Sequence, residues 1–228
     1  MRGEIKKRLK ERFATSGLPP SSRVEILNLF LELGQWLKAN SFPAHFDSRY
    51  DLYRHIDREI IGGGPVDYLE FGVYRGDAIR FWSELNRHPD SRFFGFDTFE
   101  GLPEEWQFFT GAIPAGTWET GGKPPELGDA RVTFIKGIFQ ETLPGFLKGY
   151  TPAHRLVINC DADLYTSTLY LLVTLNHLLV RGTTVIFDEF STVHEFRAFR
   201  DFTSAFRRRY RLLASSDRFC ERVAVEFV

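Results

Sequence analysis

Two short apolar runs of the sequence end abruptly in acidic residues. The first, RLVINCDAD, covers residues 155–163, and the second, TTVIFDEF, covers residues 183–190. Asp161 and Asp188 are 27 residues apart (188 − 161), which is enough for a strand, a crossover helix and a second, adjacent parallel strand. We therefore expect the two carboxylates to emerge side by side at one edge of a sheet.

Acids clustered in this way could hold a divalent cation. Glu189 follows Asp188 at once, and Asp163 lies two residues after Asp161. Carboxylates that share one crevice repel each other and raise their own pKa values unless a cation compensates them. Oxygen ligands favour Mg²⁺ or Ca²⁺, with Mn²⁺ possible. The alternative is that Asp163 caps the helix beginning near Leu164 and that Glu189 faces solvent; we interpret Asp163 as such a cap.

A second group of residues could bind an adenosyl ligand. In YLEFGVYRGDAIR, residues 68–80, Gly72 permits a tight turn and Gly76 opens a helix whose first N–H groups are free. Glu70 suits a cationic sulfonium better than a pyrophosphate. Asp97 lies 21 residues after Gly76 (97 − 76), where an acid can accept both ribose hydroxyls. The pattern favours adenosine with a positive tail over NAD; the alternative is two ordinary turn glycines and a helix-capping aspartate.

Strand-like and helix-like segments alternate from residue 66 onward and would position these residues. Such alternation predicts a parallel sheet covered by helices on both faces. The expected strands lie near residues 66–73, 92–97, 131–137, 155–161, 183–190, 210–215 and 222–228, and the expected helices near 76–88, 140–149, 164–180 and 194–210.

Two segments fall outside this alternation. Residues 1–60 read as helical, and in residues 21–40 a Ser cap precedes a helix with one apolar face. We expect residues 1–60 to form an extension or lid and residues 61–228 to form the main domain. The stretch 101–130 is rich in glycine and proline and carries four bulky aromatic residues, so we expect a long loop that covers a ligand site; the alternative is a loop that only packs against the surface or another subunit. The expected apolar face of the first helix consists of Val24, Leu27, Phe30, Leu31 and Leu37.

The overall composition excludes several classes of partner. A net charge of −1 over 228 residues provides no field that would draw the chain to nucleic acid or to an anionic membrane. The arginines of residues 197–211 alternate with a phenylalanine stripe and are expected to form a solvated helix face. The two cysteines, Cys160 and Cys220, and the charged N-terminus predict a cytoplasmic chain with free thiols.

Several of these motifs together resemble a known family. YLEFGVYRGDAIRFW, FFGFDTFEGLPEEW, FIKGIFQETLPGFL, DADLYTSTLYLL and VIFDEF are similar, in this order, to segments of the macrocin O-methyltransferase family, which includes sugar-methylating enzymes of antibiotic biosynthesis. The resemblance covers about residues 66–228. It implies an α/β, Rossmann-like class I S-adenosylmethionine (SAM) methyltransferase fold. Such a fold has a seven-stranded, mostly parallel sheet whose last strand is antiparallel, here with an N-terminal helical extension.

The resemblance also implies roles for individual residues. A divalent metal, usually Mg²⁺, would be held by Asp161, Asp188 and Glu189, although many relatives carry a second Asp in place of Glu189. Asp97 would hold the ribose. The remaining cofactor-binding positions would be Glu70, Gly72, Val73 and Gly76 at the methionine end and Gly137, Ile138 and Phe139 near the adenine.

The expected reaction is methyl transfer from SAM to a hydroxyl of a sugar or related polyol in a small natural product. Asp161 is the expected proton acceptor, and His194, six residues after Asp188, is a second candidate, with a surface position at a helix start as its alternative. A catechol or phenol acceptor is the enzymatic alternative, and a SAM-binding protein without catalysis is the alternative from another class. A homodimer is possible, and neither nucleic acid nor a membrane is expected as a partner.

Overall fold

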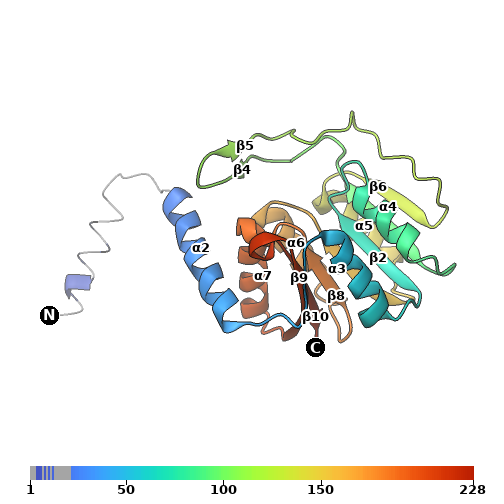
Figure 1. Cartoon of the computed structure of the whole chain (residues 1–228). Coiled ribbons are helices and arrows are strands. Elements are labelled where there is room, and N and C mark those ends of the chain that lie inside the picture. The colour runs from blue at the N-terminus through green and yellow to red at the C-terminus, as the bar shows by residue number, and fades with distance from the viewer. Residues whose placement is uncertain (1–3, 7, 9, 11, 13–21) are drawn as a thin grey trace.

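A computed structural model describes residues 4–6, 8, 10, 12 and 22–228 of the chain (Figure 1). In this part of the chain the central sheet has eight strands in the order β1-β9-β10-β8-β7-β2-β3-β6. The strands are β1 (His45–Phe46), β2 (Val66–Phe71), β3 (Arg92–Asp97), β6 (Val132–Lys136), β7 (Arg155–Cys160), β8 (Thr184–Phe187), β9 (Tyr210–Ser216) and β10 (Arg222–Phe227).

Strand directions in the sheet follow the predicted arrangement. β10 runs antiparallel to both of its neighbours, β8 and β9, and the other pairs in this sheet are parallel. The mostly parallel sheet with an antiparallel last strand is therefore confirmed. The eighth strand, β1, was missed because its two residues are too short to produce a strand period; it adds to the edge of β9 through His45 and Phe46.

Helices cover both faces of the sheet, and buried side chains separate into two clusters accordingly. One face carries α3 (Arg49–His55), which continues into a π-helical segment η1 (Ile56–Ile61), and α4 (Asp77–Leu85). The other face carries α5 (Phe139–Gly149), α6 (Tyr165–Thr174) and α7 (His194–Ala205). Short 3-10 turns, η2 (Phe190–Thr192) and η3 (Arg218–Cys220), follow β8 and β9.

Helix α2 (Ser22–Ala39) packs beside α7, on the side away from the sheet (Figure 1). Trp36 of α2 lies 5.3 Å from Phe190 and 6.0 Å from Phe196, measured between ring centroids. The predicted helix is present, and Leu37 of its predicted apolar face packs against the core, but the other four residues of that face are exposed. Leu27 and Leu31 are exposed, whereas the buried side chains are those of Ile26, Leu29 and Leu33. The Ser21 cap and most of residues 1–21 lie outside the described residues.

The glycine-rich loop contains a small hairpin that its sequence did not predict. Strands β4 (Trp106–Gln107) and β5 (Ala112–Ile113) pair antiparallel, apart from the main sheet (Figure 1). Trp106 is buried, so the loop is anchored by an aromatic side chain rather than extended into solvent.

The arginine-rich helix is only partly a solvated face. Phe196, Phe199 and Phe202 are buried as expected. Arg197 pairs with Glu25 at 2.8 Å, and Arg200 pairs with Glu32, so these arginines link α7 to α2. None of the helices in the described ranges is long and apolar enough to cross a membrane.

Candidate active site

The ends of three adjacent parallel strands bring the predicted acids together. Phe71 of β2, Cys160 of β7 and Phe187 of β8 are in register across the sheet. Beyond them, the N–H of Asp161 donates to the Phe71 carbonyl at 2.9 Å, and the N–H of Asp188 donates to the Cys160 carbonyl at 2.9 Å. The two aspartates therefore leave neighbouring strands at one edge, as their spacing predicts.

A cavity of about 310 Å³ opens at this edge. Its size is in the range of small-molecule sites. Four carboxylates line it on the side of β7 and β8, together with two guanidinium groups, and two tryptophans line it from the glycine-rich loop. These residues are Asp161, Asp163, Asp188, Glu189, Arg49, Arg222, Trp106 and Trp118. The long loop thus covers the cavity, as expected from its aromatic content.

The turn after β2 is shaped by Asp97 at the end of β3. The N–H groups of Val73 and Tyr74 donate to Asp97 Oδ2 at 2.7 and 2.8 Å, and the N–H of Phe99 donates to Oδ1 at 2.7 Å. Gly72 has φ 91°, and a Cβ there would lie 1.8 Å from the Asp161 carbonyl oxygen. Only glycine therefore fits between the ends of β2 and β7.

The other predicted cofactor-binding residues divide into two groups. Gly72, Asp97, Ile138 and Phe139 line the cavity with the acids. The other four lie near these residues in the sequence but do not line the cavity: Glu70, Val73, Gly76 and Gly137.

Glu70 is buried beneath the cavity. Its Oε2 accepts a hydrogen bond from the Tyr68 hydroxyl at 2.5 Å, and no described residue bonds to its Oε1. Burial, partly offset by the Tyr68 bond, raises the pKa of the Glu70 carboxyl to about 8. The group is therefore held largely neutral at neutral pH.

Three acids of the cavity have no cationic partner. Among the described residues, none donates a hydrogen bond or forms an ion pair with the side chains of Asp161, Asp163 or Glu189. Burial, and then repulsion by Asp188, raises the pKa of Asp161 well above its usual range, that of Asp163 to about 7 and that of Glu189 to about 8. Desolvation and like-charge repulsion are the conditions that a bound cation relieves.

The interpretation of Asp163 as a helix cap is wrong. The N-cap of α6 is Leu164, and no side chain caps this helix. Asp163 itself has a left-handed backbone, with φ 57°, and belongs to the cavity wall. The turn after β7 thus contributes a second carboxylate to the cavity instead of a cap.

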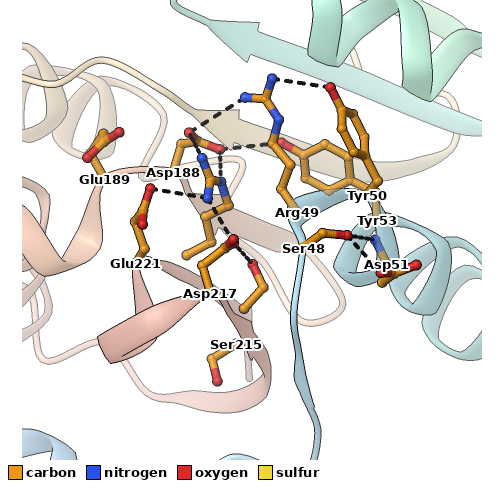
Figure 2. Close-up of polar contacts among 12 residues, drawn as sticks. Ser48, Arg49, Tyr50, Asp51, Tyr53, Asp188, Glu189, Ser215, Asp217 and Glu221 are labelled. Carbon is orange, nitrogen blue, oxygen red and sulfur yellow. Dashed lines mark hydrogen bonds and ion pairs between the residues drawn. The ribbon is translucent and has the colours of Figure 1, made fainter.

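Asp188 differs from the other acids because two arginines compensate it. Arg222 donates from Nε to Oδ1 at 2.8 Å and from Nη2 to Oδ2 at 3.1 Å, and Arg49 Nη1 lies 3.9 Å from Oδ2. The Tyr53 hydroxyl lies 3.5 Å from Oδ1. Figure 2 shows Asp188 facing Arg49, while Glu189 points away from both.

A buried glutamate on α7 ties the two acid-bearing turns together. One oxygen of Glu195 accepts the N–H of Ala162 at 3.3 Å, and the other accepts the N–H of Glu189 at 2.9 Å. These N–H groups directly follow Asp161 and Asp188 in the chain. Glu195 is fully buried, so its carboxylate fixes the relative position of the two turns from behind.

His194 lies in a second cavity, not among the acids. Its Nε2 is 2.7 Å from the Gln107 carbonyl oxygen, and it shares this cavity with Glu25, Tyr165 and Arg197. Burial lowers the pKa of the imidazole. The structure therefore does not bring His194 to Asp161. His194 lies at a helix start, as in its alternative interpretation, but it is half-buried rather than on the surface.

The acids have the oxygen donors that a hard divalent cation prefers, but their side chains are not positioned around a common point. All the candidate ligands are carboxylate oxygens, and three of the four carboxylates have no cationic partner. In the described part of the chain, however, no three acidic, histidine or cysteine side chains are arranged as a ready metal site. Asp188 in particular directs both of its oxygens to Arg222.

Sequence reasoning missed three residues of this site. Arg222 opens β10 and Arg49 opens α3, and neither lies near the acids in sequence. Glu195 is six residues past Glu189 and carries no local motif. One signal for Glu195 was available: it is an acidic residue in the first turn of α7, next to the phenylalanines of the buried face of that helix.

The sequence matches the family model described as Macrocin-O-methyltransferase (TylF) over residues 47–218. A curated relative from Streptomyces olivaceus, 8-demethyl-8-(2,3-dimethoxy-alpha-L-rhamnosyl)-tetracenomycin-C 4'-O-methyltransferase, is 32% identical, and the alignment covers 62% of this chain. The aligned part spans 62% of the length of that relative.

Two solved structures are similar in fold. The O-methyltransferase NovP has a TM-score of 0.59 at 20% identity, with 90% of this chain and 99% of that chain covered. A calicheamicin methyltransferase has a TM-score of 0.60 at 21% identity, with 98% of this chain and 91% of that chain covered. These two likenesses concern the fold of the chain.

Proposed function

The chain belongs to the macrocin-O-methyltransferase family, and from this premise we propose that it transfers a methyl group from SAM to a sugar hydroxyl. Its fold is the class I SAM-methyltransferase fold that the motifs predicted. The acceptor would be a sugar or related polyol of a small natural product. One observation carries the proposal: a single cavity joins the glycine turn and Asp97 on one side to four carboxylates on the other.

The SAM end of the cavity would be formed by the ends of β2, β3 and β6. Gly72 and Asp97 line it, and Ile138 and Phe139 close it from the start of α5. Val73, Gly76 and Gly137 would act by shaping the turns, since they support the wall without lining it. Glu70, neutral and buried behind the turn, would support the methionine end from below.

A divalent cation such as Mg²⁺ would be held by Asp161, Asp188 and Glu189. Bound there, it would lower the pKa of an acceptor hydroxyl and orient its oxygen. The support for this site is the all-oxygen donor set and the absence of ion pairs of Asp161 and Glu189 among the described residues. Metal dependence is thus part of the proposal, and removal of the cation by a chelator should stop turnover.

Asp161 would accept the proton of the acceptor hydroxyl. Asp161 is the first residue after β7, where its N–H bonds to the Phe71 carbonyl at the end of β2. It lines the cavity together with Gly72 and the other acids. Without a cation, burial and the neighbouring Asp188 raise its pKa, so the carboxylate then binds a proton more readily than an exposed aspartate does. His194 remains a weaker proposal because it lies in the second cavity.

The acceptor is proposed from the chemistry of the cavity and from the relative. Trp106 and Trp118 line the cavity, and aromatic side chains suit the apolar C–H face of a sugar ring. The curated relative is named for a rhamnosyl acceptor. A catechol or phenol could use the same faces, and it is the alternative acceptor; a SAM-binding protein without catalysis has no use for the acid cluster.

Three further aspects of the proposal concern the whole chain. Residues 61–228 would form the SAM-binding domain, and residues 1–60 would form an extension that helps to close the site or to form a homodimer, although its β1 and α3 pack on the main sheet. Nucleic acid is not proposed as a partner. A cytoplasmic location is supported by Cys160 and Cys220, which are free thiols.

Calorimetry and a transfer assay test the proposal together. Calorimetry should show binding of SAM and not of NAD, and labelled SAM should transfer its methyl group to a rhamnoside in the presence of Mg²⁺. Transfer to catechol but to no sugar would support the alternative acceptor. SAM binding without transfer to any diol would support the non-catalytic alternative, and binding of NAD alone would overturn the cofactor assignment.

A further inference from the structure

One guanidinium group occupies both oxygens of Asp188. Arg222 forms a two-pronged contact with this carboxylate, 2.8 Å from Nε to Oδ1 and 3.1 Å from Nη2 to Oδ2. The Asp188 side chain is only 3% exposed, although it lines the cavity, so few of its interactions are with bulk water. Paired, charge-assisted bonds of this geometry are among the stronger polar contacts in proteins.

Arg222 is itself held by two other carboxylates. Its Nη1 donates to Asp217 at 2.8 Å and to Glu221 at 3.3 Å. The backbone of Arg222 pairs with Ser216 as β10 begins, while Val223 pairs with Phe187 beside the acid-bearing turn. The antiparallel last strand therefore places the Arg222 guanidinium at the end of β8. Asp217 and Glu221 are the other carboxylates that this guanidinium contacts.

The remaining acids of the cavity contrast with Asp188. Asp161, Asp163 and Glu189 have no ion pair among the described residues, although Glu189 is adjacent to Asp188 in the chain. In the cation site of the proposed function, an oxygen of Asp188 is a ligand together with Asp161 and Glu189. The divalent cation would then share that carboxylate with a guanidinium of the same sign of charge, which weakens its binding.

We propose that Arg222 is an internal counter-ion that competes with a divalent cation for Asp188. The inference rests on the cation site of the proposed function and adds to it a residue that sets the affinity of that site. When the cation binds, Arg222 gives up its bonds to Asp188 and keeps those to Asp217 and Glu221. Arg49, 3.9 Å from Oδ2, is the second cation beside this carboxylate and stays in place.

A calorimetric titration with Mn²⁺ alone tests the competition. Arg222→Gln removes the competing charge, so its Mn²⁺ affinity should be about tenfold or more higher than that of the wild-type protein. Arg222→Lys keeps a positive charge and should stay closer to the wild type. Arg155→Gln is a matched control: Arg155 pairs with buried Glu226 at 3.0 Å but opens β7, at the opposite end of the strand from Asp161.

The outcomes separate this inference from the proposed function. If the wild-type protein and Arg222→Gln both bind SAM but the variant binds Mn²⁺ equally or more weakly, the competition is wrong and the proposed function stands. No Mn²⁺ binding by either protein would also overturn the inference. If neither protein binds SAM, the proposed function fails instead, whatever Mn²⁺ does.

A measurement on the wild-type protein covers the case in which Arg222→Gln does not fold, since it leaves a buried carboxylate with less compensation. The Nε–H signal of Arg222 in a nitrogen-15 spectrum can be assigned by its loss in Arg222→Lys. Saturating Mg²⁺ should shift this signal, because the bond to Asp188 Oδ1 is given up. A signal that Mg²⁺ leaves unchanged would contradict the exchange of partners.

Discussion

Glu195 positions the two acid-bearing turns without lining the cavity. Glu195→Ala removes the acceptor of the Ala162 and Glu189 N–H groups, so Asp161 and Asp188 should lose their relative alignment. We expect kcat of methyl transfer to fall about a hundredfold while the Kd of SAM stays nearly unchanged. Glu195→Gln keeps one acceptor oxygen, so its kcat should lie between those of Glu195→Ala and the wild-type protein.

The control for this prediction is Glu141→Ala, which removes an exposed first-turn glutamate from α5. It should leave both kcat and SAM affinity at the wild-type level. Full activity of Glu195→Ala, or an equal loss of SAM affinity and turnover, would show that Glu195 does not act through the acid turns.

Glu70 gives the fold a pH dependence of known sign. The pKa of its carboxyl rises from 4.5 to about 8 on folding, mainly because burial penalises the charged form. Its contribution to stability is therefore complete below the unfolded pKa and is lost as the pH rises toward the folded pKa. Relative to Glu70→Gln, the wild-type free energy of unfolding should fall by up to about 4 kcal/mol between about pH 5 and pH 8.

Urea unfolding of the ligand-free proteins at several pH values measures this difference. Glu84→Gln, at an exposed site of α4, should keep the wild-type dependence. If Glu70→Gln and the wild-type protein lose stability in parallel as the pH rises, Glu70 is not the buried acid that titrates.

At the scale of single residues, the sequence was informative where chemistry follows strand ends. Asp161 and Asp188 could be placed because parallel strands end at a common edge, and Gly72 because only glycine fits a close turn. Arg222 and Glu195 could not be placed. Their contacts depend on which residues face each other once β10 lies beside β8 and α7 packs on the sheet, and the sequence near Arg222 and Glu195 does not specify these partners.

At the scale of elements, α2 shows why an apolar stripe does not by itself identify the packed face. The helix carries leucines on both sides. Leu33 is 1% exposed and belongs to the same core cluster as the phenylalanines of α7, whereas Leu31 is 61% exposed. Periodicity located the helix correctly, but the choice between its faces depends on the neighbour it meets, α7.

The two leucines of α2 form a matched pair for experiment. Leu33→Ala removes a packed side chain and should lower the free energy of unfolding by about 2 to 5 kcal/mol. Leu31→Ala removes an exposed one and should change it by no more than about 0.5 kcal/mol. Urea unfolding measures both, and equal losses from the two variants would contradict the packing of α2 on α7.

The shortest elements were the hardest to predict. The hairpin β4–β5 and the edge strand β1 have two residues per strand, which is too few to show a period. Helix α6 ends at Thr174, six residues before the predicted end. The residues that follow form hydrogen-bonded turns instead of a continued helix. Strands β2, β3 and β7 were predicted close to their observed positions, whereas α7 begins where predicted but ends at Ala205, five residues before the predicted end.

At the scale of the whole molecule, the cavity joins motifs that are far apart in the sequence. The turn after β2, the end of β3 and the acids after β7 and β8 meet because the sheet order places β2 between β3 and β7, with β8 next. The family resemblance anticipated this convergence. The charge balance inside the cavity was not anticipated, because Arg49 and Arg222 arrive from the first helix beside the sheet and from the last strand.

The central claim is that this cavity binds SAM and that Asp161 takes the proton of the acceptor hydroxyl. The most direct measurement is methyl transfer from labelled SAM by Asp161→Asn, with the Kd of SAM determined on the same preparation. We predict that turnover falls about a thousandfold and that SAM affinity stays nearly unchanged. Wild-type turnover by Asp161→Asn would contradict the account.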